Sequence, residues 1–296
     1  TAQAYTPIEA LEGDSRLKAN FVDPYKANPD MNVLVRPAEL YNSMVHPLLP
    51  LSARGVVWYQ GEGNWGDYPI YPLLMKTLIN GWRRNFAHSE MPFYYVQIAP
   101  WGFGQDTSSK EWFYTQGEAI GYAYMREAQA LTREQVSHSG MAVTMDVGDP
   151  DDIHPTNKRP VGERLARLAL NGTYGRSEVA CLGPRYNSMK VENGVVKLLF
   201  DNAEGLKTND GQAPKHFYVA STAGSEHKFW PASAEIHGSE VWLTCPDVVT
   251  TSTAASGVAV RYAFLLYPMT NLENGAGLPA EPFRTDSWSA EISYVY

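Results

Sequence analysis

The sequence predicts an α/β protein, in which a parallel sheet with flanking helices is followed by a β-sandwich. Over the first 176 residues, short apolar runs alternate with stretches whose apolar residues recur at helical spacing. Such alternation is typical of parallel strands joined by right-handed helical crossovers. From about residue 177 onward, short strand-like runs are separated only by turns, which is the pattern of a sandwich. We therefore expect an α/β domain over 1–176, a β-sandwich over 177–267 and an Asn/Gly/Pro-rich segment over 268–296.

The elements of the first domain follow from the spacing of apolar residues. Residues 1–36 are punctuated by Asp, Asn, Pro and Gly, and we expect them to be irregular. Pro37 begins a short helix, because proline is tolerated in the first turn. Compact apolar runs predict strands and apolar residues at helical intervals predict helices. The strands are Gly55–Gln60, Phe93–Ala99 and Met141–Asp146, and the helices are Tyr68–Phe86, Gly117–Glu134 and Asn157–Tyr174, with a loop over 100–116.

The second domain is predicted to be built from short strands. Asn193-Gly194 is a hairpin turn signal, because both residues tolerate the backbone angles of a two-residue turn. Cys181 and Cys245 are the only cysteines of the chain; they form a disulfide or remain two buried thiols, and their spacing does not decide between the two. The expected strands are Ser188–Val191, Val195–Phe200, His216–Ala220, Ala234–His237, Val241–Thr244 and Val258–Phe264.

Composition excludes several classes of function. The 296 residues carry a formal net charge of −8, from 24 basic and 32 acidic residues, and show no basic stripe. A nucleic-acid partner is therefore not expected. No apolar run approaches the ~20 residues that a membrane-spanning helix needs, so no membrane partner is expected. No Cys-x-x-Cys or His-x-x-x-His spacing occurs, so we expect no metal site.

The segment Asp149-Pro150-Asp151-Asp152-Ile153-His154-Pro155 carries the first candidate site. It lies between a predicted strand and a predicted helix, and in an open α/β sheet ligands bind outside the carboxyl ends of the strands. A carboxylate beside an imidazole fixes its tautomer and stabilises its charged form, as a general base in acyl transfer requires. Taken alone, the segment is also consistent with an ordinary helix start with acidic residues near the positive end of the helix dipole.

A second polar segment follows another predicted strand. Gln60 closes the strand, and Gly61-Glu62-Gly63-Asn64 comes directly after it. Glycines permit a tight backbone turn there, so the neighbouring polar side chains can converge. Two polar segments at the ends of two strands of one sheet favour a functional site more than either segment alone.

The motifs taken together resemble the sialate O-acetylesterase family, a branch of the SGNH (GDSL-like) hydrolases. Members typically read LYNGMIHPLLP…GVIWYQGESN where this chain has residues 40–50 and 55–64. The resemblance runs from about residue 6 almost to the C-terminus. Further matches are Phe93-Tyr94-Tyr95-Val96-Gln97-Ile98, Arg126-Glu127-Ala128-Gln129, Asp152-Ile153-His154-Pro155, Val260-Arg261-Tyr262-Ala263 and Gly277–Asp286.

This resemblance implies an SGNH-type sheet that is incomplete at its N-terminus. The family's nucleophile is a serine in a GQSN-type motif, and no such motif occurs in this chain. Where relatives carry two glycines that contribute to the oxyanion hole, this chain has Ala4 and Tyr5. Ser43 lies in a predicted helix and Ser52 in a predicted turn, so neither replaces the nucleophile. We expect the folded protein to include a further N-terminal segment, continuous or cleaved, and we expect residues 268–296 to pack back on the catalytic domain.

The resemblance also implies roles for individual residues. His154 is the general base, and its acid partner is Asp152 on the family's D-I-H pattern or Asp151 on the wider Asp-x-x-His pattern. Gln60 donates to the oxyanion or merely closes its strand, and a donor of this kind is worth roughly 3 kcal/mol. Glu62 orients Gln60 or His154, serves as an alternative acid, or stabilises its own turn. Candidate substrate contacts are Asn64, Trp65 and Trp101.

The implied function is removal of acetyl groups from a sugar by a Ser-His-Asp mechanism, in a secreted or periplasmic protein that needs no cofactor. The sugar is sialic acid or a plant polysaccharide such as xylan or xyloglucan, and the sequence does not separate these substrates. The alternative is a non-catalytic carbohydrate-binding protein of the same fold. The missing GQSN motif favours that alternative, and the intact Asp152–Pro155 segment disfavours it.

Overall fold

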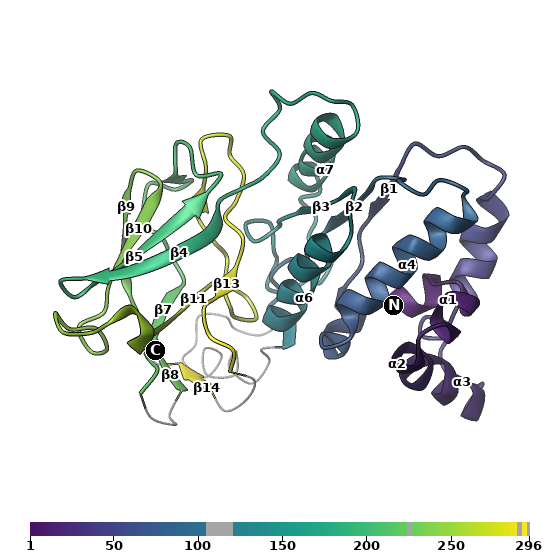
Figure 1. Cartoon of the computed structure of the whole chain (residues 1–296), viewed down its shortest axis with the longest axis horizontal. Coiled ribbons are helices and arrows are strands. Elements are labelled where there is room, and N and C mark those ends of the chain that lie inside the picture. The colour runs from purple at the N-terminus through teal and green to yellow at the C-terminus, as the bar shows by residue number, and fades with distance from the viewer. Residues whose placement is uncertain (105–120, 224–226, 289–291, 295–296) are drawn as a thin grey trace. The chain divides into compact units, whose positions relative to one another are not determined.

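The computed structural model describes residues 1–104, 121–223, 227–288 and 292–294 (Figure 1). Two compact units interleave along the chain. Unit 1 contains residues 1–98, 124–142 and 168–177, and unit 2 contains residues 99–123, 143–167 and 178–296. The domain boundaries predicted at residues 176 and 267 stay predictions.

A three-stranded parallel sheet with the order β1-β2-β3 forms the centre of unit 1. The strands are β1 (Val56–Trp58), β2 (Phe93–Val96) and β3 (Ser139–Ala142). Helix α4 (Tyr71–Asn85) connects β1 to β2, and α6 (Gly121–Gln135) connects β2 to β3. This confirms the predicted α/β class with parallel strands and helical crossovers. Strand β3 ends earlier than predicted. Residues 143–145 are buried but do not join the sheet.

Helices pack on both faces of this sheet. On one face Trp82 of α4 lies 5.9 Å from Trp58 and 6.0 Å from Phe93 (ring centroids), and the Tyr95 hydroxyl donates to Gln129 O of α6. On the other face, the Tyr94 hydroxyl lies 2.8 Å from Thr173 Oγ1, just beyond α7 (Arg159–Gly172). As predicted, these helices are amphipathic and turn their apolar faces toward the strands.

The N-terminal region is helical, which the sequence did not predict. Residues 2–27 form a succession of short helices, among them α1 (Ile8–Glu12), α2 (Ser15–Leu17) and α3 (Asp23–Ala27). Helix α1 spans only five residues, and α2 and α3 are joined by a π-helical segment over Lys18–Val22, so the run does not keep the regular spacing of an α-helix. The helix expected after Pro37 is present: residues 39–48 are helical, with π geometry over Tyr41–Val45 and 3₁₀ geometry over His46–Leu48.

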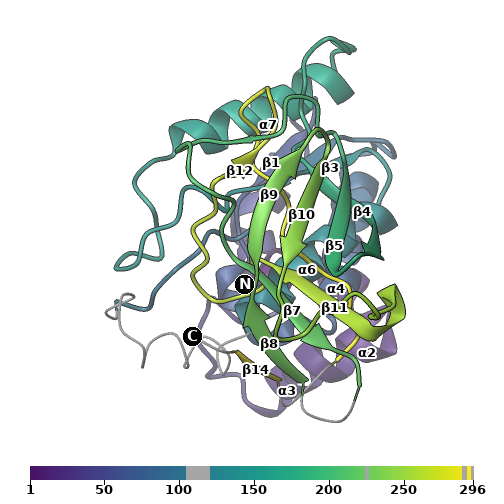
Figure 2. The same cartoon turned by 90° about the vertical axis from the view of Figure 1, so that its left-hand side faces the viewer.

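Unit 2 contains two larger sheets made mostly of antiparallel pairs, as the change of pattern near residue 177 predicted. The four-stranded sheet has the order β4-β5-β10-β9, and Figure 2 faces it; the other sheet has the order β13-β11-β7-β8-β14. Among the strands of unit 2 that the structure describes, β14 and β8 pair in parallel and the others pair antiparallel. The strands are β4 (Arg185–Glu192), β5 (Val195–Asp201), β6 (Lys207–Thr208), β7 (Phe217–Ser221), β8 (His227–Pro231), β9 (Ser233–His237), β10 (Glu240–Thr244), β11 (Val258–Tyr262), β12 (Leu272–Glu273), β13 (Phe283–Arg284) and β14 (Ile292–Tyr294).

Two features hold unit 2 together. The predicted hairpin joins β4 to β5, and Asn193 and Gly194 take φ values of 51° and 80°, as a two-residue turn requires. The side chains of Arg261 and Asp286 form a fully buried ion pair with Nε–Oδ2 and Nη2–Oδ1 distances of 2.8 and 2.7 Å. Both residues lie in motifs that match the family, and the pair joins β11 to the C-terminal segment. Breaking such a pair typically costs about 3–5 kcal/mol.

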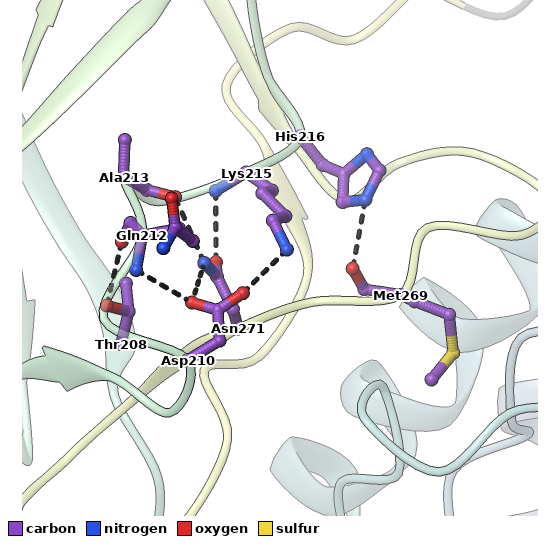
Figure 3. Close-up of polar contacts among 8 residues, drawn as sticks. All are labelled: Thr208, Asp210, Gln212, Ala213, Lys215, His216, Met269 and Asn271. Carbon is purple, nitrogen blue, oxygen red and sulfur yellow. Dashed lines mark hydrogen bonds and ion pairs between the residues drawn. The ribbon is translucent and has the colours of Figure 1, made fainter.

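A polar cluster fixes the loop that leads into β7 (Figure 3). The Asp210 carboxylate pairs with Lys215 Nζ at 2.6 Å and accepts from Asn271 Nδ2 at 2.9 Å. Next to it, the His216 ring lies 3.0 Å from Met269 O through Nε2. Burial of the ring lowers the pKa of His216 to about 4, and the carbonyl of Met269 only partly offsets this effect. The ring is therefore neutral at pH 7 and donates its Nε2 proton to Met269.

Acidification below pH 6.5 should destabilise the protein through His216. The unfolded chain binds a proton near pH 6.5, whereas the folded chain binds it only near pH 4. The stabilisation is therefore complete above pH 6.5 and is lost as the pH falls toward 4, by roughly 3 kcal/mol at most. Urea unfolding at pH 7, 5.5 and 4 should show this loss in the wild type.

His216→Gln is the matched variant, because its amide still reaches a carbonyl but does not titrate. The variant should lose less stability than the wild type over the same interval. Asp210 affects both proteins equally: its pKa is lowered to about 2 by Lys215 and Asn271, so its contribution to stability is lost mainly as the pH falls below 3.8. Parallel stability curves for the two proteins would show that His216 is not the titrating group.

Candidate functional site

The loop between β3 and α7 is organised by carboxylates. Asp146 holds Arg164 of α7 through two hydrogen bonds of 2.7 and 2.6 Å, and Arg164 also donates to Val143 O. Farther along, Asp149 Oδ1 accepts the backbone N–H groups of Asp151 and Asp152, at 2.8 and 3.1 Å. These bonds define the path of the loop before it reaches His154. Aspartate side chains commonly stabilise turns in this way.

The structure brings His154 and Asp152 together. Asp152 Oδ1 accepts the backbone N–H of His154 at 2.7 Å and lies 3.7 Å from the imidazole Nδ1. The second distance permits an ion pair but exceeds a hydrogen bond. The His154 side chain is 86% exposed, so its ring is free to turn. Of the two acids left open by the sequence, Asp152 is the one within ion-pair distance of the ring among the described residues; Asp151 is exposed.

The end of β1 is fixed by the side chain of Gln129 from α6. Gln129 Oε1 accepts Ile98 N–H at 2.9 Å, while Nε2 donates to Val96 O at 3.1 Å and to Gln60 O at 3.5 Å. A side chain at position 61 would collide with Ile98 and with the Gln129 amide. Gly61 is therefore needed because the turn after β1 passes directly against this amide.

Asn64 is the centre of the second polar segment and is 1% exposed. Its Oδ1 accepts Ala2 N–H at 2.8 Å and Gln60 Nε2 at 2.9 Å. Its Nδ2 donates to Gln3 Oε1 at 2.9 Å and to Asp67 Oδ2 at 2.8 Å. The amide thus makes four hydrogen bonds within the protein. Its role as a substrate contact stays a prediction, and the structure adds that it orients the side chain of Gln60.

The remaining candidates near β1 have distinct environments. Gln60 Oε1 is buried and has no hydrogen-bond partner among the described residues. Glu62 is half-buried, and Trp65 is exposed. Burial and, to a smaller extent, the negative charge of Glu62 together raise the pKa of Tyr59 to about 12. A carboxylate at this position therefore acts on its neighbours electrostatically.

Trp101 belongs to unit 2 and stacks on Phe103, with ring centroids 3.8 Å apart. Its Nε1 is buried without a hydrogen-bond partner among the described residues. The rest of the predicted loop, from residue 105 to 116, lies outside the described residues. Sequence reasoning did not select Phe103 or Gln129; the only signal for Gln129 was its place in the Arg126–Gln129 motif.

The candidate residues thus form two groups, one in each compact unit. Gln60, Glu62, Asn64 and Trp65 belong to unit 1, whereas Asp151, Asp152, His154 and Trp101 belong to unit 2. Within the part of the chain that the structure describes, no three His, Cys, Asp or Glu side chains gather so that they could hold a metal ion. None of the described helices is both long and apolar enough to cross a membrane.

Comparison with known proteins places the chain among carbohydrate esterases. Residues 27–171 match the family model described as "Carbohydrate esterase, sialic acid-specific acetylesterase". The chain is 27% identical over 284 residues to sialate O-acetylesterase from Mus musculus, covering 88% of this chain and 50% of that protein. With the Homo sapiens sialate O-acetylesterase it is 27% identical over 305 residues, covering 94% of this chain and 55% of that protein. The chain therefore spans about half the length of the curated relatives it matches.

A solved structure agrees with these matches. The crystal structure of a carbohydrate acetylesterase from Xanthomonas citri superposes with a TM-score of 0.76 at 33% sequence identity. The match covers 97% of this chain and 59% of that chain. Sequence and fold thus agree on one family, and residues 27–171 carry its domain. Residues 27–171 thus match the family of sialic acid-specific acetylesterases, and the chain is similar to known carbohydrate acetylesterases along most of its length.

Proposed function

We propose that this chain contributes the histidine base, its acid partner and an oxyanion donor to a carbohydrate O-acetylesterase. The observation that carries the proposal is the imidazole of His154, 3.7 Å from the Asp152 carboxylate in the loop that follows a parallel strand of a carbohydrate esterase domain. The substrate is an acetylated sugar, either sialic acid or a plant polysaccharide such as xylan or xyloglucan. We further propose that the protein acts in the periplasm or outside the cell.

The proposed reaction is acyl transfer through a serine that lies outside this chain. The serine oxygen attacks the acetyl carbonyl carbon while the imidazole of His154 takes the hydroxyl proton. Asp152 faces Nδ1, which leaves Nε2 for that proton. The bond to the sugar oxygen then breaks, and the imidazolium returns the proton to this oxygen. Water attacks the acetyl-enzyme by the same route and releases acetate, so the scheme needs no metal or organic cofactor.

The long contact between His154 and Asp152 is compatible with this role. Hydrogen bonds of a catalytic base are often loose before substrate binds and tighten in the complex. Asp152 already accepts the backbone N–H of His154 at 2.7 Å, so a small rotation of the imidazole shortens the contact to Nδ1. Asp152 is therefore our choice over Asp151 as the acid.

Gln60 is the proposed oxyanion donor. An amide nitrogen carries two hydrogens, and Gln60 gives one of them to Asn64 Oδ1. The second remains for an oxyanion. Asn64 is buried, and both the oxygen and the nitrogen of its amide form hydrogen bonds within the protein. It therefore holds Gln60 in one orientation before negative charge develops on the oxyanion. Preorganised donors of this kind stabilise a transition state most.

The open edge of β1 supports the proposal that another polypeptide segment completes the sheet and brings the serine. Within the described residues, no strand pairs with β1 on the side away from β2. Val56 N–H donates to Pro92 O on the β2 side, so the N–H and C=O of Val57 point to the open side by alternation. The side chain of Val57 is 66% exposed, although strands of parallel sheets are usually buried on both faces.

His154→Ala in the complete protein should abolish hydrolysis of p-nitrophenyl acetate, with a loss of about 10³-fold or more in kcat. The melting temperature should stay nearly unchanged, because the side chain is largely exposed. Steady-state kinetics and thermal unfolding measure the two effects.

His237→Ala is the matched control, since this histidine is also exposed but lies on β9 in the β-rich region. It should keep wild-type turnover. If His154→Ala retains activity within a few-fold of wild type, His154 is not the base. If the wild type itself shows no hydrolysis, the non-catalytic alternative is favoured.

Charge-removing variants should identify the acid. Asp152→Asn should lower turnover by orders of magnitude, because an amide no longer stabilises the imidazolium. Asp151→Asn should change turnover only a few-fold, because an exposed acid contributes little. Activity that survives both changes but disappears in Glu62→Gln would assign the acid to the segment after β1 instead.

A further inference from the structure

The outermost ring of an aromatic cluster in unit 2 belongs to Phe103. Its ring stacks on Trp101 at 3.8 Å with an interplanar angle of 23° and meets the edge of Tyr122 at 5.6 Å. Tyr122 is 1% exposed, whereas Phe103 is 39% exposed. Because Trp101 covers one face of the Phe103 ring, the exposed part of Phe103 is a flat apolar surface backed by a second ring.

The backbone at Phe103 adopts a left-handed conformation. Its φ of 57° lies in the left-handed region, which bulky residues rarely adopt. Such strain persists only where the surrounding structure enforces it, and it concentrates at ligand-binding sites.

Two backbone hydrogen bonds hold the loop of Phe103 against the loop of His154. Gly104 N–H donates to Pro150 O at 2.9 Å, and Asp149 N–H donates to Pro100 O at 3.2 Å. A side chain at Gly148 would collide with Pro100 O, so the two segments depend on this close approach. The same Asp149 binds the N–H groups of Asp151 and Asp152. Phe103 is thus fastened to the start of the segment that carries His154.

The charges around this loop pair are negative. Three carboxylates, those of Asp149, Asp151 and Asp152, follow one another within four residues. Burial raises the pKa of the Tyr267 hydroxyl, and the charges of Asp149 and Asp151 raise it further. The field of these carboxylates therefore extends beyond the loop and disfavours an anionic ligand.

We propose that Phe103 is a binding platform for an uncharged pyranose ring of an acetylated polysaccharide. The C–H face of such a ring packs on an aromatic face, and the neighbouring carboxylates accept hydrogen bonds from its hydroxyls. The ring on Phe103 belongs to a sugar unit beside the one that loses its acetyl group. The loss of an acetyl group from the neighbouring sugar unit rests on the proposed function, whereas the binding of a sugar ring to Phe103 does not. It selects neutral polysaccharide over sialic acid as the substrate class.

Isothermal titration calorimetry of the complete protein with xylotetraose and cellotetraose tests the platform. Phe103→Ala should weaken the binding of at least one of these neutral probes about tenfold, because it removes the stacking surface. Phe103→Trp should bind within a few-fold of wild type. Tyr174→Ala is the matched control, because Tyr174 is a 61% exposed aromatic residue just after α7 and should leave affinity unchanged.

The inference is overturned if neither neutral probe binds the wild type, or if Phe103→Ala binds as well as wild type. It is also overturned if N-acetylneuraminic acid binds more tightly than the neutral probes and depends on Phe103. Release of acetate from acetylated xylan is measured separately. Absence of acetate release together with Phe103-dependent binding would contradict the esterase proposal while leaving the platform in place.

Discussion

The fold around the candidate site depends on how the carboxyl ends of β1 and β2 are satisfied inside the protein. Buried backbone groups at strand ends are costly when they lack partners, by about 1–3 kcal/mol each. Helix α6 supplies these partners with side chains three residues apart: Gln129 binds Val96, Ile98 and Gln60, and Arg126 Nε donates to Ile98 O at 3.0 Å. Both side chains are almost completely buried. One helix therefore determines where two strands stop.

This constraint extends to the candidate oxyanion donor. Because the Gln129 amide occupies the space beside β1, position 61 accepts only glycine without a rearrangement, and the chain turns immediately after Gln60. The turn brings Asn64 beneath the Gln60 side chain, and Asn64 in turn binds residues of the N-terminal helices through Ala2 and Gln3. The orientation of one amide in the proposed site thus depends on contacts among four separate parts of unit 1. We regard this as preorganisation of the kind that acyl transfer requires.

Sequence reasoning identified the strands and helices whose apolar residues recur at a regular spacing. It missed contacts between residues that are far apart in the sequence. The three parallel strands and the helices α4, α6 and α7 follow from apolar spacing. Residues 143–146 were predicted to be part of a strand because apolar residues indicate burial. Whether a buried segment joins a sheet also depends on hydrogen bonds to a neighbouring strand. The sequence motifs left Asp152 and Asp151 open as partners of His154, and the structure brings Asp152 within 3.7 Å of the imidazole. Two of the four hydrogen bonds of Asn64 were not predictable, because their partners Ala2 and Gln3 are 62 and 61 residues away. Phe103 was missed because a left-handed backbone leaves no mark on a phenylalanine in the sequence.

The central claim is that His154 activates a serine outside this chain, and labelling with a fluorophosphonate tests it most directly. The complete protein is treated with the reagent and digested, and mass spectrometry locates the modified residue. The account predicts modification of one serine outside residues 1–296, and loss of that modification in His154→Ala. Modification of a serine within this chain, or labelling that is unaffected by His154→Ala, would contradict the account.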